Sequence, residues 1–251
     1  MEDKKIISIE DRIPKLKKQR KKKANRRLVF YLSLFFVLIS IIIYLQSPLS
    51  YIKNIHVYGH HVLHENEIIE LSDIKNDTNI WKVNLSEVED AILKNPFIKD
   101  VQVQRKLPST IAVEVEEYKI IGYLEKEDSY QPLLENGEEV DYENRYQQGD
   151  APLLIHFDDE DILNSIAGQL QGIPDNILRL ISEIHWEPEK ENKYKVNLFM
   201  NDGYLVKGSI RNLAEKMEVY PSVVSQLEPE QKGIIHLNVG VYFEEYVKES
   251  E

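Results

Sequence analysis

The chain has 251 residues, no cysteine and a formal net charge of −12. The absence of cysteine excludes disulfides, so any part folded outside a cell must depend on its hydrophobic core. The charge is unevenly divided, because residues 1–27 carry twelve Lys and Arg against four acids, a net charge of +8, which leaves −20 for residues 28–251.

Residues 28–45 form an apolar run, LVFYLSLFFVLISIIIYL, without a charge, Gly or Pro. As a helix rising ~1.5 Å per residue it extends about 27 Å, close to the hydrocarbon thickness of a bilayer. A helix lets Ser33 and Ser40 each hydrogen-bond to the preceding turn. Residues 44–48 (YLQSP) offer no small-residue cleavage site. We therefore expect a retained transmembrane helix and not a cleaved signal peptide.

The basic residues 1–27 flank this run on one side only. A positive flank stays in the cytoplasm, which predicts a single-pass type II membrane protein whose C-terminal part lies outside. The tail has three interpretations: a topology determinant, a contact for anionic lipid headgroups, or a nucleic-acid site. It contains no aromatic residue and is tethered to the membrane, so nucleic-acid binding is not expected.

The segment that follows alternates between strand and helix patterns. Five elements are predicted in the order strand, helix, helix, strand, strand: Tyr51–Tyr58, Glu65–Leu71, Leu85–Lys94, residues 97–105 and residues 110–118. Asn84 is the expected N-cap of the second helix, and Trp81 is expected to anchor the turn before it. This order predicts a three-stranded sheet with two helices on one face.

That order, just outside a membrane anchor, resembles a POTRA domain, with residues 105–108 (RKLP) in the hairpin and residues 115–118 (VEEY) leaving it. Together with the basic tail it is similar to the FtsQ/DivIB family of bacterial cell-division proteins. The resemblance implies an α+β chain with an N-terminal transmembrane helix, a POTRA domain (β-α-α-β-β) and a mixed β domain with helices packed on the sheet. The parts expected are a cytoplasmic basic tail (1–27), a transmembrane helix (28–45), a POTRA domain (50–119), a β domain (120–246) and a short C-terminal tail (247–251).

Within residues 120–246 the pattern predicts more strands than helices. Residues 120–139 read as two strands joined by a polar turn, and Asn201-Asp202-Gly203 is a strong hairpin signal. The remaining predicted elements are helices Asp161–Leu170, Asp175–Ser182 and Leu213–Tyr220, and strands Tyr194–Met200, Tyr204–Ile210, Gly233–Val239 and Val241–Tyr246. Tyr220–Pro221 lies at the expected helix break, and we hypothesise that this bond gives two slowly exchanging conformers.

Candidate chemical sites are few. A cluster of four histidines (His56, His60, His61 and His64) could bind zinc, but the rings would diverge at a strand end, so exposed polar residues are the favoured interpretation. The acids of residues 158–161 fit an N-cap and first helical turn better than a catalytic pair. Residues 203–209 mimic a P-loop but lack its Lys, and they read as a hairpin. We therefore expect no catalytic, metal or cofactor site, and no enzyme.

The two late strands are the favoured binding feature. Two apolar-aromatic strands near the C-terminus are expected to leave one strand at a sheet edge, where unpaired backbone groups accept a partner strand. The alternative is an ordinary final strand protected by Glu244, Glu245 and the charged tail. The candidate partner-binding residues are Ile234, Ile235, Leu237, Val239, Val241, Tyr242, Phe243 and Tyr246.

The family resemblance implies what this edge binds. In that family the late strands bind two small coiled-coil division proteins, DivIC and FtsL, and so support the septal penicillin-binding transpeptidase indirectly. The implied function is a divisome scaffold concentrated at the septum of the cell membrane. The alternatives are a membrane-tethered extracytoplasmic adaptor unrelated to division and a cell-wall enzyme.

Overall fold

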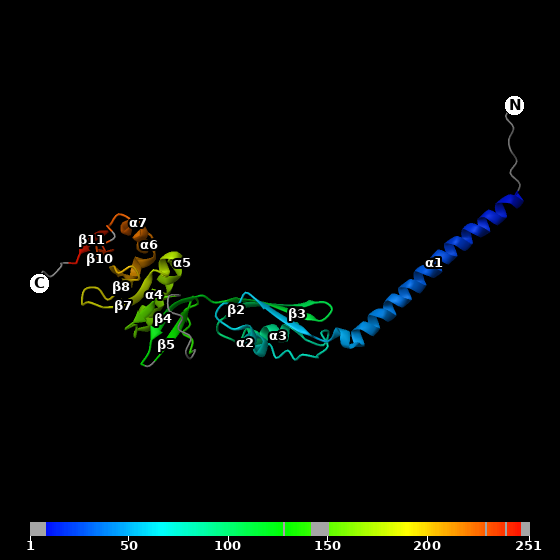
Figure 1. The fold of residues 1–251 in the computed structure, drawn as a ribbon, viewed down its shortest axis with the longest axis horizontal. Helices are drawn as coiled ribbons and strands as arrows, with labels where there is room; N and C mark the ends of the chain where they lie inside the picture. Colours follow the sequence, from blue (N-terminus) through cyan, green and yellow to red (C-terminus); the bar gives the residue numbers. More distant parts are fainter. Residues whose placement is uncertain (1–8, 128, 142–150, 229, 239, 247–251) are drawn as a thin grey trace, which may run out of the picture. The chain divides into compact units, whose positions relative to one another are not determined.

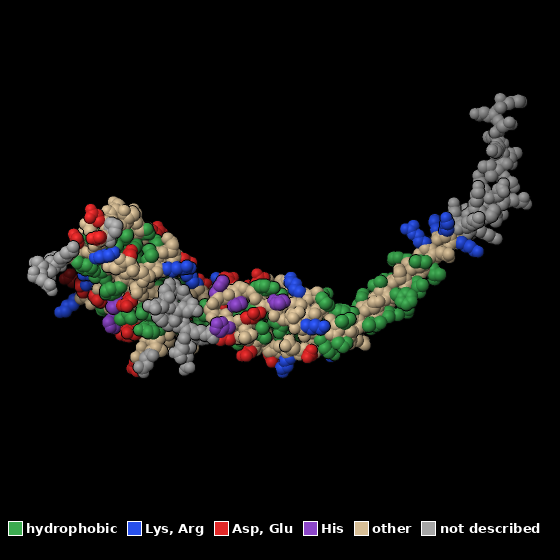
Figure 2. Space-filling model, viewed as in Figure 1, with side chains coloured by type: hydrophobic (Ala, Val, Ile, Leu, Met, Phe, Trp, Pro, Cys, Tyr) green, Lys and Arg blue, Asp and Glu red, His purple; other side chains and the backbone are tan. Residues whose placement is uncertain are grey.

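The computed structural model of the chain describes residues 9–127, 129–141, 151–228, 230–238 and 240–246. Helix α1 (Ile9–Gln46) contains a 26-residue stretch, Lys21–Gln46, that is long and apolar enough to span a membrane and has no buried residues. Figure 2 shows its hydrophobic surface, with Lys and Arg side chains at the N-terminal end of that surface. As expected, Ser33 Oγ donates to Phe30 O at 2.9 Å and Ser40 Oγ donates to Phe36 O at 2.9 Å.

The chain divides into two compact units (Figure 1). The first unit includes α1, a 3-10 turn η1 (Pro48–Ser50), β1 (Asn54–Tyr58), α2 (Glu65–Leu71), α3 (Leu85–Ile92), most of β2 (Ile98–Lys106) and most of β3 (Thr110–Glu117). Its sheet has the order β1-β3-β2, and β1 runs parallel to β3. In Figure 1 both short helices lie on one face of this sheet. The predicted strand-helix-helix-strand-strand order is confirmed.

The core of the first unit is formed by buried aliphatic side chains of its three strands and of α2 and α3, such as Val57, Ile68 and Ile111. Gly59 has φ +82° after β1, and a Cβ there would collide with the backbone of Val115, so only Gly fits. Asn84 occupies the N-cap of α3 without a side-chain cap bond. The prediction for Trp81 is wrong: its side chain is 44% exposed, and its neighbour Ile80 is the fully buried anchor of the loop.

The second unit is built on an eight-stranded mixed sheet with the order β11-β10-β9-β8-β7-β6-β4-β5. Its strands are β4 (Ile120–Glu125), β5 (Tyr130–Leu134), β6 (Leu153–Ile155), β7 (Ile181–Trp186), β8 (Lys195–Met200), β9 (Leu205–Ser209), β10 (Gly233–His236) and β11 (Tyr242–Glu245). Its helices are α4 (Glu160–Gly172), α5 (Asp175–Leu178), the 3-10 turn η2 (Ile210–Asn212), α6 (Leu213–Met217) and α7 (Tyr220–Val224).

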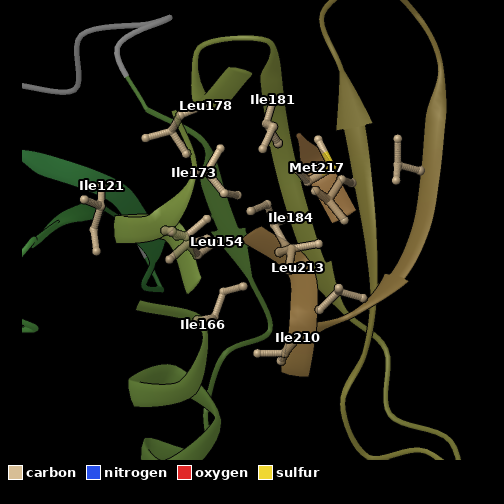
Figure 3. Close-up of a cluster of buried hydrophobic side chains, with 14 of the residues drawn as sticks. Ile121, Leu154, Ile166, Ile173, Leu178, Ile181, Ile184, Ile210, Leu213 and Met217 are labelled. Atoms are coloured by element: carbon tan, nitrogen blue, oxygen red, sulfur yellow. The ribbon is translucent and has the colours of Figure 1, made fainter. Parts of the chain in front are cut away.

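Helices pack on the sheet through one continuous hydrophobic core, as Figure 3 shows for residues such as Ile166 of α4, Ile184 of β7 and Leu213 of α6. Helix α4 begins as predicted, because Asp159 is the N-cap and its carboxylate accepts a hydrogen bond from Ile162 N at 3.1 Å. The expected hairpin joins β8 and β9 through Gly203, which has φ +89°. The α+β fold class is confirmed.

Two helix predictions need correction. The helix expected over Asp175–Ser182 stops at Leu178, and β7 begins at Ile181. The helix expected over Leu213–Tyr220 is two short helices, and Pro221 lies in the first turn of the second one, where its missing N–H has no helical partner to lose. Among the residues described, the cis peptide bond is Leu107–Pro108, so Tyr220–Pro221 is trans in this structure.

Candidate partner-binding edge of the eight-stranded sheet

The two edges of the large sheet differ in how far they are already closed. At β5, Pro132 has no N–H, and its carbonyl accepts a hydrogen bond from Val140 N at 3.0 Å. An isolated bridge pairs Leu133 with Glu139, and Leu134 N donates to Glu138 O at 2.9 Å. The chain therefore folds back over its own β5 edge. At the opposite edge, β11 has β10 as its neighbour, and no second neighbour within the described ranges.

The strand β10 lies inside the sheet. It pairs in parallel with β9, with Ile234 opposite Leu205, and antiparallel with β11, with Ile235 opposite Phe243. Leu237 N also donates to Lys207 O at 2.8 Å, on the β9 side. Both sides of β10 are occupied by the chain itself, so β10 cannot accept a partner strand.

The hydrogen-bond register determines which backbone groups of β11 point outward. Opposite residues in an antiparallel pair alternate between bonded and non-bonded pairs. Tyr246 N donates to Lys232 O at 3.0 Å, so Tyr246 and Lys232 form a bonded pair. By alternation, the next bonded pairs along the strands are Glu244 with Ile234 and Tyr242 with His236. The N–H and C=O groups of the two residues between them, Phe243 and Glu245, therefore face away from β10. Leu237 N donates to β9, which agrees with this alternation, because the residues of β10 between the bonded pairs then face β9.

Side chains hold β11 on both faces of the sheet. On one face, the Tyr242 ring stacks on His236 with centroids 4.3 Å apart, and Glu244 Oε2 lies 2.8 Å from His236 Nε2. On the other face, Phe243 packs against the core and meets Tyr204 edge to face, with centroids 6.2 Å apart. The edge strand is thus positioned before any partner arrives, which lowers the ordering cost of strand addition.

Gly233 permits the close approach of β10 and β11. A Cβ at this position would lie 2.9 Å from Glu245 Cα and 2.9 Å from Phe243 Cε2, and closer still to Glu244 O. Any side chain at Gly233 therefore pushes against β11 itself.

A polar network lies beside this edge. The buried Tyr220 hydroxyl donates to the Asp202 carboxylate, at 2.8 Å from Oδ1 and 2.9 Å from Oδ2. Burial first, and the Asp202 carboxylate second, raise the pKa of Tyr220 far above its ordinary value. Lys232 Nζ donates to Asp202 O at 2.7 Å and lies 4.6 Å from the Tyr204 ring centroid. Because Lys232 O accepts from Tyr246 N, the network links α7 to β11.

The predicted binding residues differ in how far they are buried. Ile235 and Leu237 are fully buried core residues, so no partner reaches their side chains. Val241, Tyr242 and Tyr246 are exposed, and Ile234 and Phe243 are half-buried. Val239 lies outside the described residues. Sequence reasoning missed the structural contributions of Gly233 and His236. For Gly233 a signal was available, because it is a glycine at the start of an apolar strand.

The other candidate sites have structural explanations. His64 is the N-cap of α2, and its backbone N–H donates to Glu67 Oε2 at 2.8 Å. His60 Nδ1 lies 3.1 Å from Leu63 O. Within the part of the chain that the structure describes, no three His, Asp or Glu side chains gather as metal ligands.

Two family models match the chain, one after the other. "POTRA domain, FtsQ-type" matches residues 50–118, and "Cell division protein FtsQ/DivIB, C-terminal" matches residues 122–239. A curated relative, Cell division protein DivIB of Bacillus subtilis (strain 168), is 43% identical over 246 residues, which are 97% of this chain and 93% of the relative. The chain belongs to the FtsQ/DivIB family.

A further curated relative agrees with this assignment. Cell division protein DivIB of Geobacillus kaustophilus (strain HTA426) is 42% identical, over 98% of this chain and 95% of the relative. A solved structure, the major extracytoplasmic domain of the trans isomer of DivIB from Geobacillus stearothermophilus, is 35% identical, covers 46% of this chain and 98% of that one, and has a TM-score of 0.40. The two family models and the two DivIB relatives show that this FtsQ/DivIB protein has a role in cell division and contains a POTRA domain.

Proposed function

We propose that this protein is a non-enzymatic scaffold of the division machinery that docks a partner protein by strand addition to β11. The observation that carries the proposal is the outer edge of β11, which has no second neighbour within the described residues. The backbone groups of Phe243 and Glu245 point away from β10, on a strand that Tyr204 and His236 already hold in place. Backbone pairing supplies affinity in this mode, and alternate side chains supply specificity.

The proposed partner is a DivIC-type coiled-coil division protein, acting together with an FtsL-type protein. It would offer an extended segment beyond its coiled coil, because β11 needs a strand and not a helix. The exposed Glu244 and Glu245 side chains favour a partner strand that carries Lys or Arg. Tyr242 and Tyr246 provide exposed aromatic contact area on the same face as Glu244. The septal transpeptidase would be affected indirectly, through this complex.

The proposed location is the cell membrane at the division septum, in type II orientation. The support for orientation is the excess of Lys and Arg in residues 1–27 over the uncharged flank after α1. The same tail is proposed to contact anionic lipid headgroups on the cytoplasmic side. Imaging a fluorescent N-terminal fusion in growing cells tests the location: a septal band is expected, and a uniform membrane signal contradicts it.

The docking mode is tested by proline substitutions that exploit the alternation along β11. Glu245→Pro removes an outward N–H without removing a bond to β10, and Pro is tolerated on an edge strand. We expect the full-length variant to keep wild-type thermal stability and to bind a purified DivIC-type partner about tenfold more weakly, the equivalent of one or two hydrogen bonds.

Two further variants separate backbone effects from side-chain and folding effects. Glu245→Ala removes the same side chain but keeps the N–H, so it should bind within twofold or so of wild type. Glu244→Pro removes an inward N–H and should lower stability as well as binding. If Glu245→Pro binds the partner as tightly as wild type while remaining folded, strand addition to β11 is wrong.

A further inference from the structure

The end of the anchor helix is hydrogen-bonded to the first folded unit. Tyr44 OH donates to Pro108 O at 2.7 Å, in the hairpin between β2 and β3. Asn79 Nδ2 donates to Leu45 O at 2.8 Å and to Ser50 Oγ at 2.9 Å. Tyr44 is the next-to-last residue of the apolar run, where a tyrosine ring favours the membrane interface. The hairpin and the loop that bond to this last turn would therefore lie at the level of the lipid headgroups of a bilayer that α1 spans.

Three segments make up this end of the unit, residues 47–53, 77–83 and 104–110, and together they are called the membrane-proximal tip. They carry four basic residues (Lys53, Lys82, Arg105 and Lys106) and one acid, Asp77, a net charge of 4 − 1 = +3. Residues 28–251 as a whole carry −20. The membrane-proximal tip is therefore positively charged within an otherwise acidic part of the chain, and it lies at the C-terminal end of the anchor.

The tip also exposes large apolar side chains. Leu49 is 62% exposed, Leu107 at the hairpin turn is 58% exposed and Trp81 is 44% exposed. Such a combination of apolar, aromatic and basic side chains on one end is typical of a surface that lies in a membrane interface. Figure 2 shows hydrophobic side chains continuing from the helix onto the adjoining end of this unit.

Exposed Trp81 is held in a fixed loop. Arg105 donates from Nε to Ile80 O at 2.9 Å and from Nη2 to Val83 O at 2.6 Å, so its guanidinium bridges the loop on both sides of Trp81. The guanidinium carbon also lies 5.8 Å from the Trp81 ring centroid. Trp81 N donates to Asn79 Oδ1 at 3.0 Å. The ring is therefore presented to solvent by a preorganised backbone.

We propose that the membrane-proximal tip binds the phospholipid surface at the C-terminal end of α1. Leu107 and Trp81 enter the headgroup region, and Lys82, Lys106 and Lys53 pair with lipid phosphates. The contact gives the POTRA domain a second attachment to the membrane besides its covalent link to α1. This proposal depends on the anchor but not on partner docking at β11, so either can fail without the other.

The test uses the full-length chain in lipid nanodiscs of equal parts phosphatidylglycerol and phosphatidylcholine. The chain has no cysteine, so a single Cys labels one site. Leu107→Cys carries an environment-sensitive nitrobenzoxadiazole dye at the tip. Leu93→Cys is the matched control, because Leu93 is 43% exposed and precedes the start of β2, whereas Leu107 follows the end of β2. The two ends of β2 are about 26 Å apart at ~3.3 Å per residue.

We expect a spin label on the lipid headgroups to quench the dye at position 107 several times more than at position 93. Equal quenching at the two positions overturns the proposal. A second comparison separates contact from mere tethering: Lys82→Glu should lower the quenching at position 107, whereas Lys94→Glu, an exposed charge at the other end of the unit, should not. If Lys82→Glu leaves the quenching unchanged, the tip is near the membrane but does not bind it. Circular dichroism confirms that each variant is folded.

Discussion

Replacing Gly233 by Ala tests how β11 is held, because the three atoms nearest to the added Cβ all belong to β11. Carbon atoms in contact normally lie about 3.5–4.0 Å apart, and the new Cβ would lie 2.9 Å from Glu245 Cα and from the Phe243 ring. β11 must therefore move away by roughly 0.6 Å or more. The Tyr246 N to Lys232 O bond, 3.0 Å in this structure, would then lengthen to about 3.6 Å, beyond hydrogen-bond range.

The cost follows from the bonds that are lost. One or two backbone hydrogen bonds at about 0.5–1.5 kcal/mol each give a loss of about 0.5–3 kcal/mol, and overpacking gives about 1–3 kcal/mol. Amide hydrogen exchange on the full-length protein reports this loss of stability at individual residues. The amides of Glu244 and Tyr246, which bond to β10 and its extension, should lose protection. Gly240→Ala is the control, since a Cβ there has no neighbour within 4 Å. Unchanged protection of Glu244 and Tyr246 in Gly233→Ala would refute this account of the edge.

Three further predictions concern stability, each measured by denaturant unfolding of the full-length protein. Tyr220→Phe removes the hydroxyl that bonds to Asp202 and should cost about 1.5–3 kcal/mol; because the folded pKa of Tyr220 is raised, wild-type stability should also fall as the pH rises above about 10, and this fall should be smaller in the variant. The hydrogen bond from Lys119 lowers the pKa of the exposed Asp175, so Asp175→Asn should cost at most about 0.5 kcal/mol at pH 7, and the difference should vanish as the pH falls below about 4. Gly168→Ala on the exposed face of α4, where a Cβ meets nothing, should stabilise the protein by about 0.5–1 kcal/mol, and a loss of stability would contradict that.

The sequence predicted the anchor and the first sheet because their signals are local. Eighteen uncharged residues define α1's apolar stretch, and clean alternation defines β1, β2 and β3. β7 was missed for a physical reason: its pairing with β8 shifts register between Ile181 and Glu183, so its inward residues Ile181 and Ile184 are three apart, as in a helix. β6 has only three residues, too few for a periodic signal.

The proposed binding edge was only partly predictable. The apolar pattern of residues 233–246 indicated two strands, but sheet order is a long-range property, and only the structure distinguishes the inner β10 from the outer β11. The same holds for Trp81. An aromatic residue in a turn predicts a buried anchor, but Arg105, 24 positions later, bonds to the loop backbone so that Ile80 points inward and Trp81 outward.

The most direct test of strand addition at β11 is the exchange of individual backbone amides with and without a bound DivIC-type partner. In the free protein, the amides of Phe243 and Glu245 should exchange fast, and that of Glu244, which bonds to β10, should exchange slowly. At partner concentrations where an independent assay shows saturation, Phe243 and Glu245 should become protected by about tenfold or more, the equivalent of about 1.4 kcal/mol. If both amides exchange at their free rates in the saturated complex, the partner binds elsewhere and the account of β11 is contradicted.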